Sequence, residues 1–237
     1  MCGRFAFFSP REAVIAAFGA ELDFQFDPRY NIAPSQDVTL IRLDEHGDLR
    51  VDRYRWGLVP FWAKDPAIGN RMINARAETV AEKPSFRQSF SRRRCLVLAS
   101  GFYEWHKDGS GKTPFFISRE DGQPFGMAGM WDEWAIAKQN KGDSRGDAMV
   151  NRECKALRTC AVITKPANEF MRGMHDRMPV IMGGNAAMTW LNNEVPKDEL
   201  LNMVLGPQTI DLQAWPVSKA VNNPINDDVS LIDRART

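Results

Sequence analysis

The stretch RCLVLASGFYEW, residues 94–105, predicts a buried β-strand that turns at Gly101, because its first half is apolar and rich in residues that favour strands. Two further strands are predicted upstream, at VTLIRL (38–43) and LRVDRYRWG (49–57). A turn at residues 46–48 separates these two segments and predicts a hairpin. Short strands are also expected downstream, at TPFFIS, PFGMAGMW, TCAVITK and MPVIM.

Helices are predicted at irregular places between these strands. Residues 9–12, SPRE, have the pattern of a capping box with proline at the first helical position, and Gly19 is expected to end that helix. Other helices are expected at NARAETVAEK, SFRQSFSRRR, NAAMTWLN and KDELLNMVL. Closely spaced strands with scattered helices indicate the α+β class rather than alternating βαβ units.

The composition is that of an ordinary globular protein, with 43% hydrophobic and 26% charged residues in a chain of 237. No internal repeat and no long linker divides the sequence, so we expect a single domain over residues 1–237. The polar segment 137–154 has no apolar period, and we expect it to be a flexible excursion from that domain.

Membrane insertion and metal binding are not indicated by the sequence. No positively charged segment followed by an apolar one opens the chain, and no apolar run approaches the roughly 18 residues of a membrane span, so we expect a cytoplasmic protein. The four cysteines show no CxxC spacing and the three histidines lie far apart, which predicts neither a zinc site nor a disulfide framework. We therefore expect no metal and no cofactor.

The formal net charge of +1 conceals a basic stretch between residues 71 and 94. Only Glu78 and Glu82 oppose the cations in this stretch, which are Arg71, Arg76, Lys83, Arg87, Arg92, Arg93 and Arg94. Such a run fits either a solvated helix face or a surface that faces an anion.

The sequence begins MCGRF, so removal of Met1 would leave an amine and a thiol on adjacent carbons of Cys2. An α-amine has a pKa of about 7.7–8.0 and is partly neutral near pH 7, so it can attack an aldehyde to give a Schiff base. The thiol can then add to the imine carbon and close a five-membered thiazolidine, which requires an N-terminal cysteine. A small residue at position 2 is equally expected from initiator processing alone.

Three polar residues in apolar surroundings are candidates for moving protons or holding reactants. Glu104 lies between aromatic residues in GFYEWH, where desolvation raises a carboxyl pKa, although an exposed strand glutamate is the alternative. His175 in MHDRMPVIM can act as a general acid or base, or can have a structural role. Asn74 in INARAET can orient an amine, or can simply cap a helix.

The motifs MCGRF, YNIAP, NARAET, GFYEW and HDRMPV, in this order, resemble the SRAP family, the SOS response-associated peptidase-like proteins that shield abasic sites in DNA. The resemblance extends from Cys2 to PVSKAVNNP near Val217. It implies a mostly antiparallel sheet curled into a barrel-like core with peripheral helices. It also implies single-stranded DNA with an abasic site as the partner, and we expect a monomer that is nucleoid-associated if the source is bacterial.

The resemblance implies catalytic roles for four residues. Cys2 would form the covalent crosslink to the ring-opened aldehyde of the abasic site, and Asn74 would position its amine. Glu104 would shuttle protons during imine formation and ring closure. His175 would assist opening of the sugar ring.

The resemblance also implies that four further residues contact DNA. Arg4 and Arg76 would hold the phosphates beside the lesion without reading bases. Pro34 and Trp62 would wedge against the neighbouring bases, although an ordinary core position is the alternative for Trp62.

The chemistry allows a side reaction, and two other function classes stay open. An imine at C1′ permits β-elimination of the 3′ phosphate, which is a lyase reaction, and the peptidase in the family name is interpreted as Met1 removal or release of the crosslink. The first alternative is an N-terminal nucleophile glutamine amidotransferase, a class that also begins with Met-Cys-Gly. The second is a non-catalytic single-stranded DNA-binding module, which would make no covalent bond.

Overall fold

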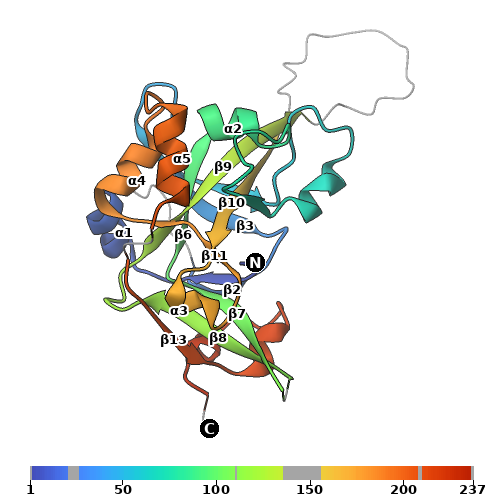
Figure 1. Ribbon diagram of the computed structural model, residues 1–237, viewed down its shortest axis with the longest axis vertical. Helices are drawn as coiled ribbons and strands as arrows, with labels where there is room; N and C mark the ends of the chain where they lie inside the picture. Colours follow the sequence, from blue (N-terminus) through green and yellow to red (C-terminus); the bar gives the residue numbers. More distant parts are fainter. Residues whose placement is uncertain (1, 21–26, 110, 136–155, 208–209, 236–237) are drawn as a thin grey trace, which may run out of the picture.

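The chain forms two β-sheets with helices on their outer sides (Figure 1). The computed structural model describes residues 2–20, 27–109, 111–135, 156–207 and 210–235. The larger sheet lies in the upper part of Figure 1 and the smaller sheet in the lower part. The excursion predicted at 137–154 lies outside the described residues.

The larger sheet closes on itself as a five-stranded barrel. Its strands are β3 (Asp37–Leu43), β4 (Leu49–Trp56), β6 (Arg94–Ala99), β9 (Phe125–Ala135) and β10 (Ala156–Pro166). They pair antiparallel in the order β4-β3-β6-β9-β10, and β10 returns to β4 through a short parallel pairing. The prediction of an α+β fold with a mostly antiparallel, barrel-like core is confirmed.

The barrel strands form where apolar residues alternate or run continuously. In β4, Tyr54 and Trp56 are buried, whereas the preceding Arg53 is exposed. This alternation is expected for a strand with one face in the core. Every residue of β6 is buried. The hairpin between β3 and β4 is also confirmed, with Leu43 opposite Leu49 and Gly47 in its turn at φ 86°.

Three short strands extend the barrel sheet. They are β5 (Asn74–Arg76), parallel to β10, β11 (Arg177–Pro179), antiparallel to β10, and β12 (Ile181–Met182), antiparallel to β9. Thr164 of β10 pairs with Arg76 of β5 and with Pro179 of β11. The motifs NARAET and HDRMPV, distant in sequence, are therefore held by the same end of β10.

The smaller sheet is entirely antiparallel. Its order is β13 (Leu212–Pro216), β8 (Gly111–Arg119), β7 (Gly101–Asp108), β1 (Phe5–Phe7) and β2 (Arg29–Ile32). β7 follows β6 directly, so the stretch RCLVLASGFYEW leaves the barrel and enters this sheet at its predicted turn. A side chain at Gly101 would place its Cβ 2.2 Å from the Phe116 ring, so this crossing requires glycine.

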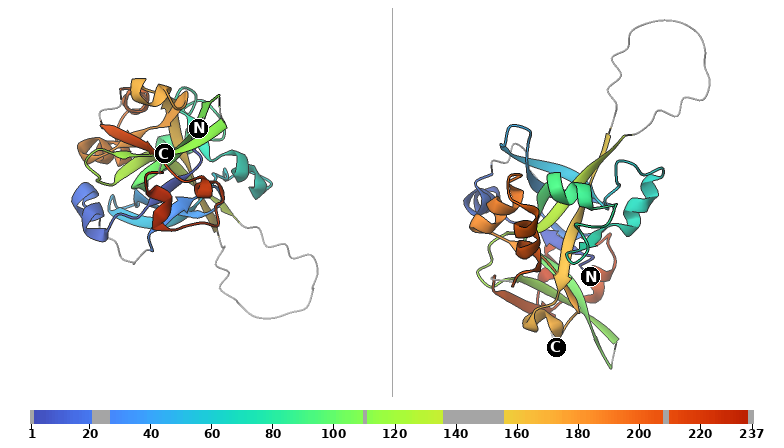
Figure 2. Two further views of the ribbon diagram at one scale, coloured as in Figure 1. Left: turned by 90° about the horizontal axis from the view of Figure 1, so that it is seen from below. Right: turned by 45° about the horizontal axis from the view of Figure 1, so that its top comes forward.

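The helices lie around the two sheets. They are α1 (Arg11–Phe18), α2 (Arg87–Arg92), α3 (Glu169–Arg172), α4 (Gly184–Leu191) and α5 (Lys197–Leu205), with 3₁₀ turns η1 (Pro66–Arg71), η2 (Lys219–Asn222) and η3 (Val229–Ile232). Figures 1 and 2 show α1, α4 and α5 together on one side of the barrel. None of the helices in the described ranges is both long and apolar enough to cross a membrane.

Two local predictions are wrong. Ser9 does not cap α1: the cap residue is Pro10, and the Ser9 hydroxyl bonds that of Ser100 instead, at 2.7 Å. Gly19 does end the helix, in a left-handed conformation with φ 65°. NARAETVAEK forms β5 and turns rather than a helix, because pairing with β10 satisfies the backbone from Asn74 onward. Asn74 is consequently not a helix cap.

Candidate active site

The N-terminal strand brings Cys2 into the interior of the molecule. β1 pairs antiparallel with β7, with Phe5 opposite Phe102. The pairing continues toward the N-terminus through a 2.9 Å hydrogen bond that the Tyr103 N–H donates to the Arg4 carbonyl. Cys2, two residues before Arg4, is fully buried.

Glu104 of β7 is the carboxyl that faces this N-terminal segment. It is only 3% exposed. Burial, together with the charge of Asp176, raises the pKa of the Glu104 carboxyl from 4.5 to about 7. Burial and then the Glu104 carboxylate raise the pKa of the Cys2 thiol. A carboxyl of pKa near 7 occurs in both protonation states at neutral pH, so it can accept a proton and return it.

Asn74 joins this group from the barrel. Its Nδ2 donates a 2.7 Å hydrogen bond to the Cys2 carbonyl, and pairing of Asn74 with Val162 of β10 fixes its backbone. The Asn74 Oδ1 atom is buried and has no hydrogen-bond partner among the residues that the structure describes. An amide with its donor on the Cys2 carbonyl and a buried acceptor to spare is suited to hold an amine.

His175 lies in the turn between α3 and β11. Its backbone N–H donates to the Met171 carbonyl at 2.9 Å, and its ring Nδ1 accepts a 3.0 Å hydrogen bond from the backbone N–H of Arg177. The Asp176 carboxylate lies 2.6 Å from the same Nδ1. Burial lowers the pKa of His175. A histidine whose pKa is lowered is neutral near pH 7, so it can take up a proton or pass one on.

Arg177 and Glu78 form an ion pair that supports the histidine turn, and sequence reasoning missed it. The Arg177 side chain is 10% exposed, and its Nη2 donates to Glu78 Oε2 at 2.9 Å and to the Thr164 carbonyl at 2.6 Å. The pair joins the chain just beyond β5 to the start of β11. Glu78 lies in the motif NARAET and Arg177 in HDRMPV. Their opposite charges were the one feature of the sequence that could have predicted the pair.

Two of the candidate DNA-binding residues, Arg76 and Trp62, are exposed. Arg76 of β5 is exposed, and no hydrogen bond or ion pair to another described residue holds its guanidinium. Trp62 is 49% exposed, so it is not a core residue, and with Ile68 and Arg71 it lines a shallow cavity. Pro34 is half-buried in the connection between β2 and β3.

Arg4 points into a hydrogen-bonded junction with the C-terminal part of the chain. Its Nη1 donates to Asn31 Oδ1 at 2.7 Å and to the Val221 carbonyl at 2.8 Å, and burial lowers its pKa. Asn31 is fully buried and donates from Nδ2 to the carbonyls of Asn223 and Asn226. The role of Asn31, in the YNIAP motif, was not anticipated.

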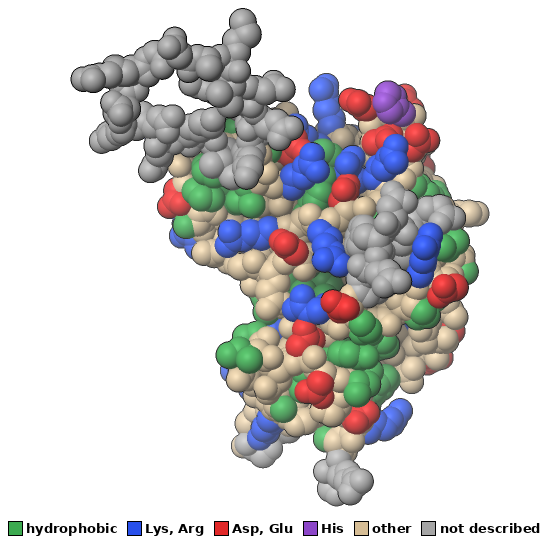
Figure 3. Space-filling model, turned by 180° about the vertical axis from the view of Figure 1, so that it is seen from behind, with side chains coloured by type: hydrophobic (Ala, Val, Ile, Leu, Met, Phe, Trp, Pro, Cys, Tyr) green, Lys and Arg blue, Asp and Glu red, His purple; other side chains and the backbone are tan. Residues whose placement is uncertain are grey.

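The surface of the molecule is indented between its two parts. Figure 3 shows an indentation between the two parts of the molecule, on the side that is at the right in Figure 1. In Figure 1 the segment around residues 60–75 lies above this side, and η2 and η3 lie below it.

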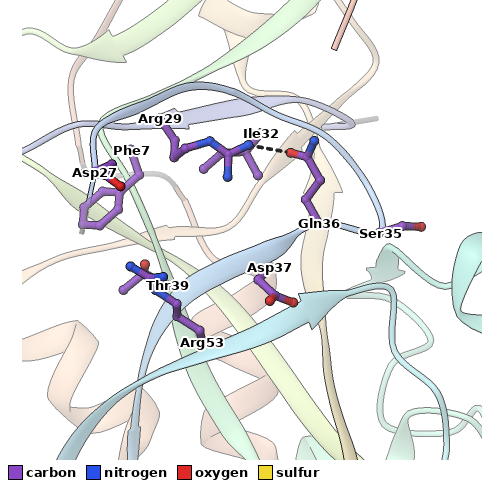
Figure 4. A pocket seen from close by; sticks show the side chains of 9 residues that line it. All are labelled: Phe7, Asp27, Arg29, Ile32, Ser35, Gln36, Asp37, Thr39 and Arg53. Carbon is purple, nitrogen blue, oxygen red and sulfur yellow. Dashed lines mark hydrogen bonds between the residues drawn. The ribbon is translucent and has the colours of Figure 1, made fainter. Parts of the chain in front are cut away.

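A separate cavity of about 520 Å³ lies under the connection between β2 and β3 (Figure 4). Arg29 and Gln36 bond each other across it at 2.9 Å. None of the four candidate catalytic residues lines this cavity, so it is distinct from the site described above.

Similar proteins were found by family and by sequence. The family model described as SOS response associated peptidase (SRAP) matches residues 1–224. The abasic site processing protein YoaM of Bacillus subtilis (strain 168) is 37% identical, over 98% of this chain and 98% of its own. The abasic site processing protein YedK of Escherichia coli (strain K12) is 34% identical, over 98% and 99% of the two chains.

A more distant relative and a solved structure agree with these matches. The abasic site processing protein HMCES of Xenopus tropicalis is 30% identical, over 86% of this chain and 65% of its own. An X-ray structure of a protein from Bacteroides thetaiotaomicron superposes with a TM-score of 0.83 at 25% identity, covering 99% of this chain and all of that one. The chain belongs to the SOS response associated peptidase (SRAP) family.

Proposed function

We propose that this protein processes abasic sites by capturing them covalently. After removal of Met1, Cys2 forms a thiazolidine with the ring-opened sugar of an abasic site in single-stranded DNA. The observation that carries this proposal is the arrangement around Cys2, with Asn74 bonded to its carbonyl and Glu104 facing it with a pKa of about 7. The names of the full-length relatives supply the substrate class.

The first step is opening of the closed deoxyribose to its aldehyde. This step requires a proton on the ring oxygen and loss of one from the C1′ hydroxyl. His175 is suited to move these protons, because it titrates in the range of an acid–base group and its turn is held by the Met171 carbonyl and the Arg177 N–H.

The second step is attack of the Cys2 α-amine on the C1′ aldehyde. The C1′–N bond forms, and the former aldehyde oxygen leaves as water after it receives two protons. Asn74 orients the amine through its Oδ1, and Glu104 takes a proton from nitrogen and passes it to the leaving oxygen. The product is an imine.

The third step is addition of the Cys2 thiol to the imine carbon. The C1′–S bond forms, and the thiol proton moves to the nitrogen with Glu104 as its carrier. Burial keeps the thiol protonated until this step, which is why a proton acceptor beside it matters. The overall reaction joins protein and DNA with loss of one water.

The same imine allows a lyase reaction when ring closure is slow. Its positive nitrogen acidifies the C2′ hydrogens, so the 3′ phosphate can leave by β-elimination. Thiazolidine formation removes the imine and suppresses strand cleavage. The peptidase in the family description is interpreted as removal of Met1 or release of the crosslink.

Binding of the lesion is assigned to four residues outside the catalytic group. Arg76 and Arg4 hold phosphates, and Trp62 and Pro34 contact the bases that flank the abasic site. Asn74 and Glu104 reach Cys2 within one copy of the chain, so the proposed chemistry needs no second copy and we expect a monomer.

Intact mass spectrometry tests the proposal. Purified protein is measured before and after incubation with a single-stranded oligonucleotide that carries one abasic site. The expected result is loss of Met1 and a new mass equal to protein plus oligonucleotide minus one water, stable to heat without borohydride. A protein that has lost Met1 and gives no adduct would overturn the proposal. The glutamine amidotransferase would then be the next function to test, with a glutaminase assay.

The variant Cys2→Ala is the matched control, because it retains the α-amine and lacks only the thiol. It should bind the same DNA and give no heat-stable adduct, while borohydride should still trap an imine. A heat-stable adduct formed by Cys2→Ala at the wild-type rate would exclude the thiazolidine.

A further inference from the structure

The basic stretch between residues 71 and 94 separates into cations that the fold uses and cations that it leaves exposed. Arg93 forms an ion pair with Asp132 and stacks on Trp131. Arg94 is buried, and its guanidinium donates to backbone carbonyls that include those of Trp190 and Phe90. The interpretation of the stretch as a solvated helix face is therefore incorrect for Arg94. The exposed cations of the stretch have a different environment.

Two of the exposed members line a cavity with a third cation from another helix. Arg87 and Arg92 project from α2, and Lys197 lies at the start of α5. The cavity measures about 430 Å³, and its other lining residues are Ala81, Gln88, Phe90 and Ser91. Positions 87, 88, 91 and 92 fall on one face of a helix, so α2 presents both guanidiniums and two polar side chains to the same space.

The three cations carry no compensating charge. Arg87, Arg92 and Lys197 are exposed. Within the described ranges, none of the three side chains forms a hydrogen bond or an ion pair. The carboxylates nearest in sequence, those of Glu82, Asp198 and Glu199, do not line the cavity. A protein of net charge +1 thus keeps three cations together around one cavity without a carboxylate among its lining residues.

We propose that this α2–α5 pocket binds the phosphodiester backbone of the captured DNA strand, beyond the nucleotides at the active site. The inference rests on the proposed function, and it adds a second contact region that none of the candidate DNA-binding residues includes. Arginine and lysine side chains that line one cavity match the phosphate oxygens of a nucleic-acid backbone, and contacts to phosphates carry no sequence information.

The pocket is within reach of the strand. β5 carries Asn74 and Arg76 at the active site, and the chain then leads through turns to α2. From Arg76 to Arg87 this connection spans at most about 40 Å even when fully extended. Single-strand-binding proteins cover sites of about 4–16 nucleotides, so one strand can contact both places.

The test compares two oligonucleotides of the same local sequence that carry a tetrahydrofuran analogue of the abasic site, which lacks the C1′ hydroxyl and so cannot open to the aldehyde and crosslink. The short one ends just beyond the position of the lesion, and the long one continues well past it in both directions. The variant Arg87→Ala/Arg92→Ala should bind the long strand roughly tenfold more weakly at physiological salt, with a salt slope smaller by about 1.4. Binding of the short strand and the yield of crosslink on a short abasic oligonucleotide should not change.

Matched controls separate charge from folding. Lys107→Ala/Lys112→Ala removes the same charge from the exposed end of the β7–β8 hairpin and should leave both affinities unchanged. Arg87→Lys/Arg92→Lys keeps the charge and should keep most of the affinity for the long strand. Thermal melting checks that the alanine variant remains folded.

Several outcomes would overturn the inference. An equal loss for short and long strands would place the two arginines at the lesion, and an unchanged affinity for the long strand would remove DNA as the ligand. Failure of the wild type to crosslink while the length-dependent loss persists would contradict the proposed function alone and leave the pocket as a DNA contact.

Discussion

The residues around Cys2 and the candidate DNA-binding residues differ in burial and in bonding. Cys2 and Glu104 are almost completely buried, and Asn74 bonds the Cys2 backbone. Trp62 is about half exposed, and Arg76 is exposed and without a bonded partner in the described chain. One region is fixed by strand pairing, whereas the other keeps its side chains available to solvent.

In the proposed mechanism, this difference separates chemistry from binding. Proton transfer needs groups held at fixed distances in a poorly solvated place, where the pKa of Glu104 reaches about 7. Contact with a flexible strand needs exposed charge and aromatic surface that adapts to it. Substitutions in the buried group should therefore change the crosslinking rate at saturating DNA, and substitutions among the exposed residues should change affinity.

The largest effect is expected for Glu104→Gln. Glutamine keeps the size and polarity of the side chain and cannot carry a proton, so the crosslinking rate at saturating DNA should fall by about 100- to 10,000-fold. Affinity for intact single-stranded DNA should stay the same. Single-turnover gel assays measure the first quantity and fluorescence anisotropy the second. A loss of affinity without a loss of rate would reverse the comparison.

The pH dependence sharpens this prediction. Glu104 accepts protons as a carboxylate, and its pKa of about 7 means that it becomes protonated below neutrality. The ratio of the wild-type rate to the Glu104→Gln rate should fall from about pH 8 to about pH 6, because the amine titrates alike in both proteins. A ratio that does not change with pH would exclude Glu104 as the proton carrier.

Glu104→Gln should also stabilise the fold at alkaline pH. The Glu104 pKa is higher in the folded state than its usual 4.5, so the wild type loses stability as pH rises from about 4.5 to about 7, and the loss is complete above 7. The full shift corresponds to about 3 kcal/mol. Chemical denaturation at about pH 5 and about pH 8 measures the free energy of unfolding near the two ends of this range. The variant should be more stable than the wild type only at the higher pH.

The next effect is expected for Glu78→Gln, which weakens the support of His175. Without the carboxylate, Arg177 loses its ion pair and the turn that carries His175 is less firmly placed. A displacement of a catalytic group by about 1 Å can cost up to about 100-fold in rate. The rate on a preformed aldehyde substrate, which needs no ring opening, should change little. An equal loss on both substrates would indicate a general structural defect.

Much of the architecture could be predicted from sequence because period and turn chemistry are local. The hairpin at Gly47, the turn at Gly101 and the late helices α4 and α5 all follow from patterns of a few residues. The segment from Asn74 has good helix formers and still pairs as a strand, because its partner β10 is remote in sequence. Such non-local pairing leaves no mark in a local pattern.

The candidate site divides in the same way. Cys2, Glu104, Asn74 and His175 were singled out by residue type and by their motifs, and the structure brings Asn74 and Glu104 to Cys2. The partners that hold these residues were not found, because a pair such as Glu78 with Arg177 becomes visible only when β5 and β11 flank the same end of β10.

Among the exposed residues, Trp62→Ala should have the largest effect. Stacking of a base on an aromatic ring is worth about 1–3 kcal/mol, so affinity should fall roughly five- to 150-fold. The crosslinking rate at saturating DNA should be unchanged. Leu205→Ala, which removes an apolar side chain of nearly equal exposure from the end of α5, is the control and should have no effect. A slower rate at saturation would mean that Trp62 also shapes the buried group.

The smallest effect is expected for Arg76→Ala, and it tests the boundary between the two regions. Arg76 is two residues from Asn74 on the same strand, yet it is exposed where Asn74 reaches Cys2. Loss of one phosphate contact on single-stranded DNA should reduce the salt slope by about 0.7 and the affinity roughly fourfold at physiological salt. Lys112→Ala removes an exposed charge elsewhere and should change neither quantity. If Arg76→Ala slowed crosslinking at saturating DNA as Glu104→Gln does, chemistry and binding would not be separable along β5, because one strand would serve both.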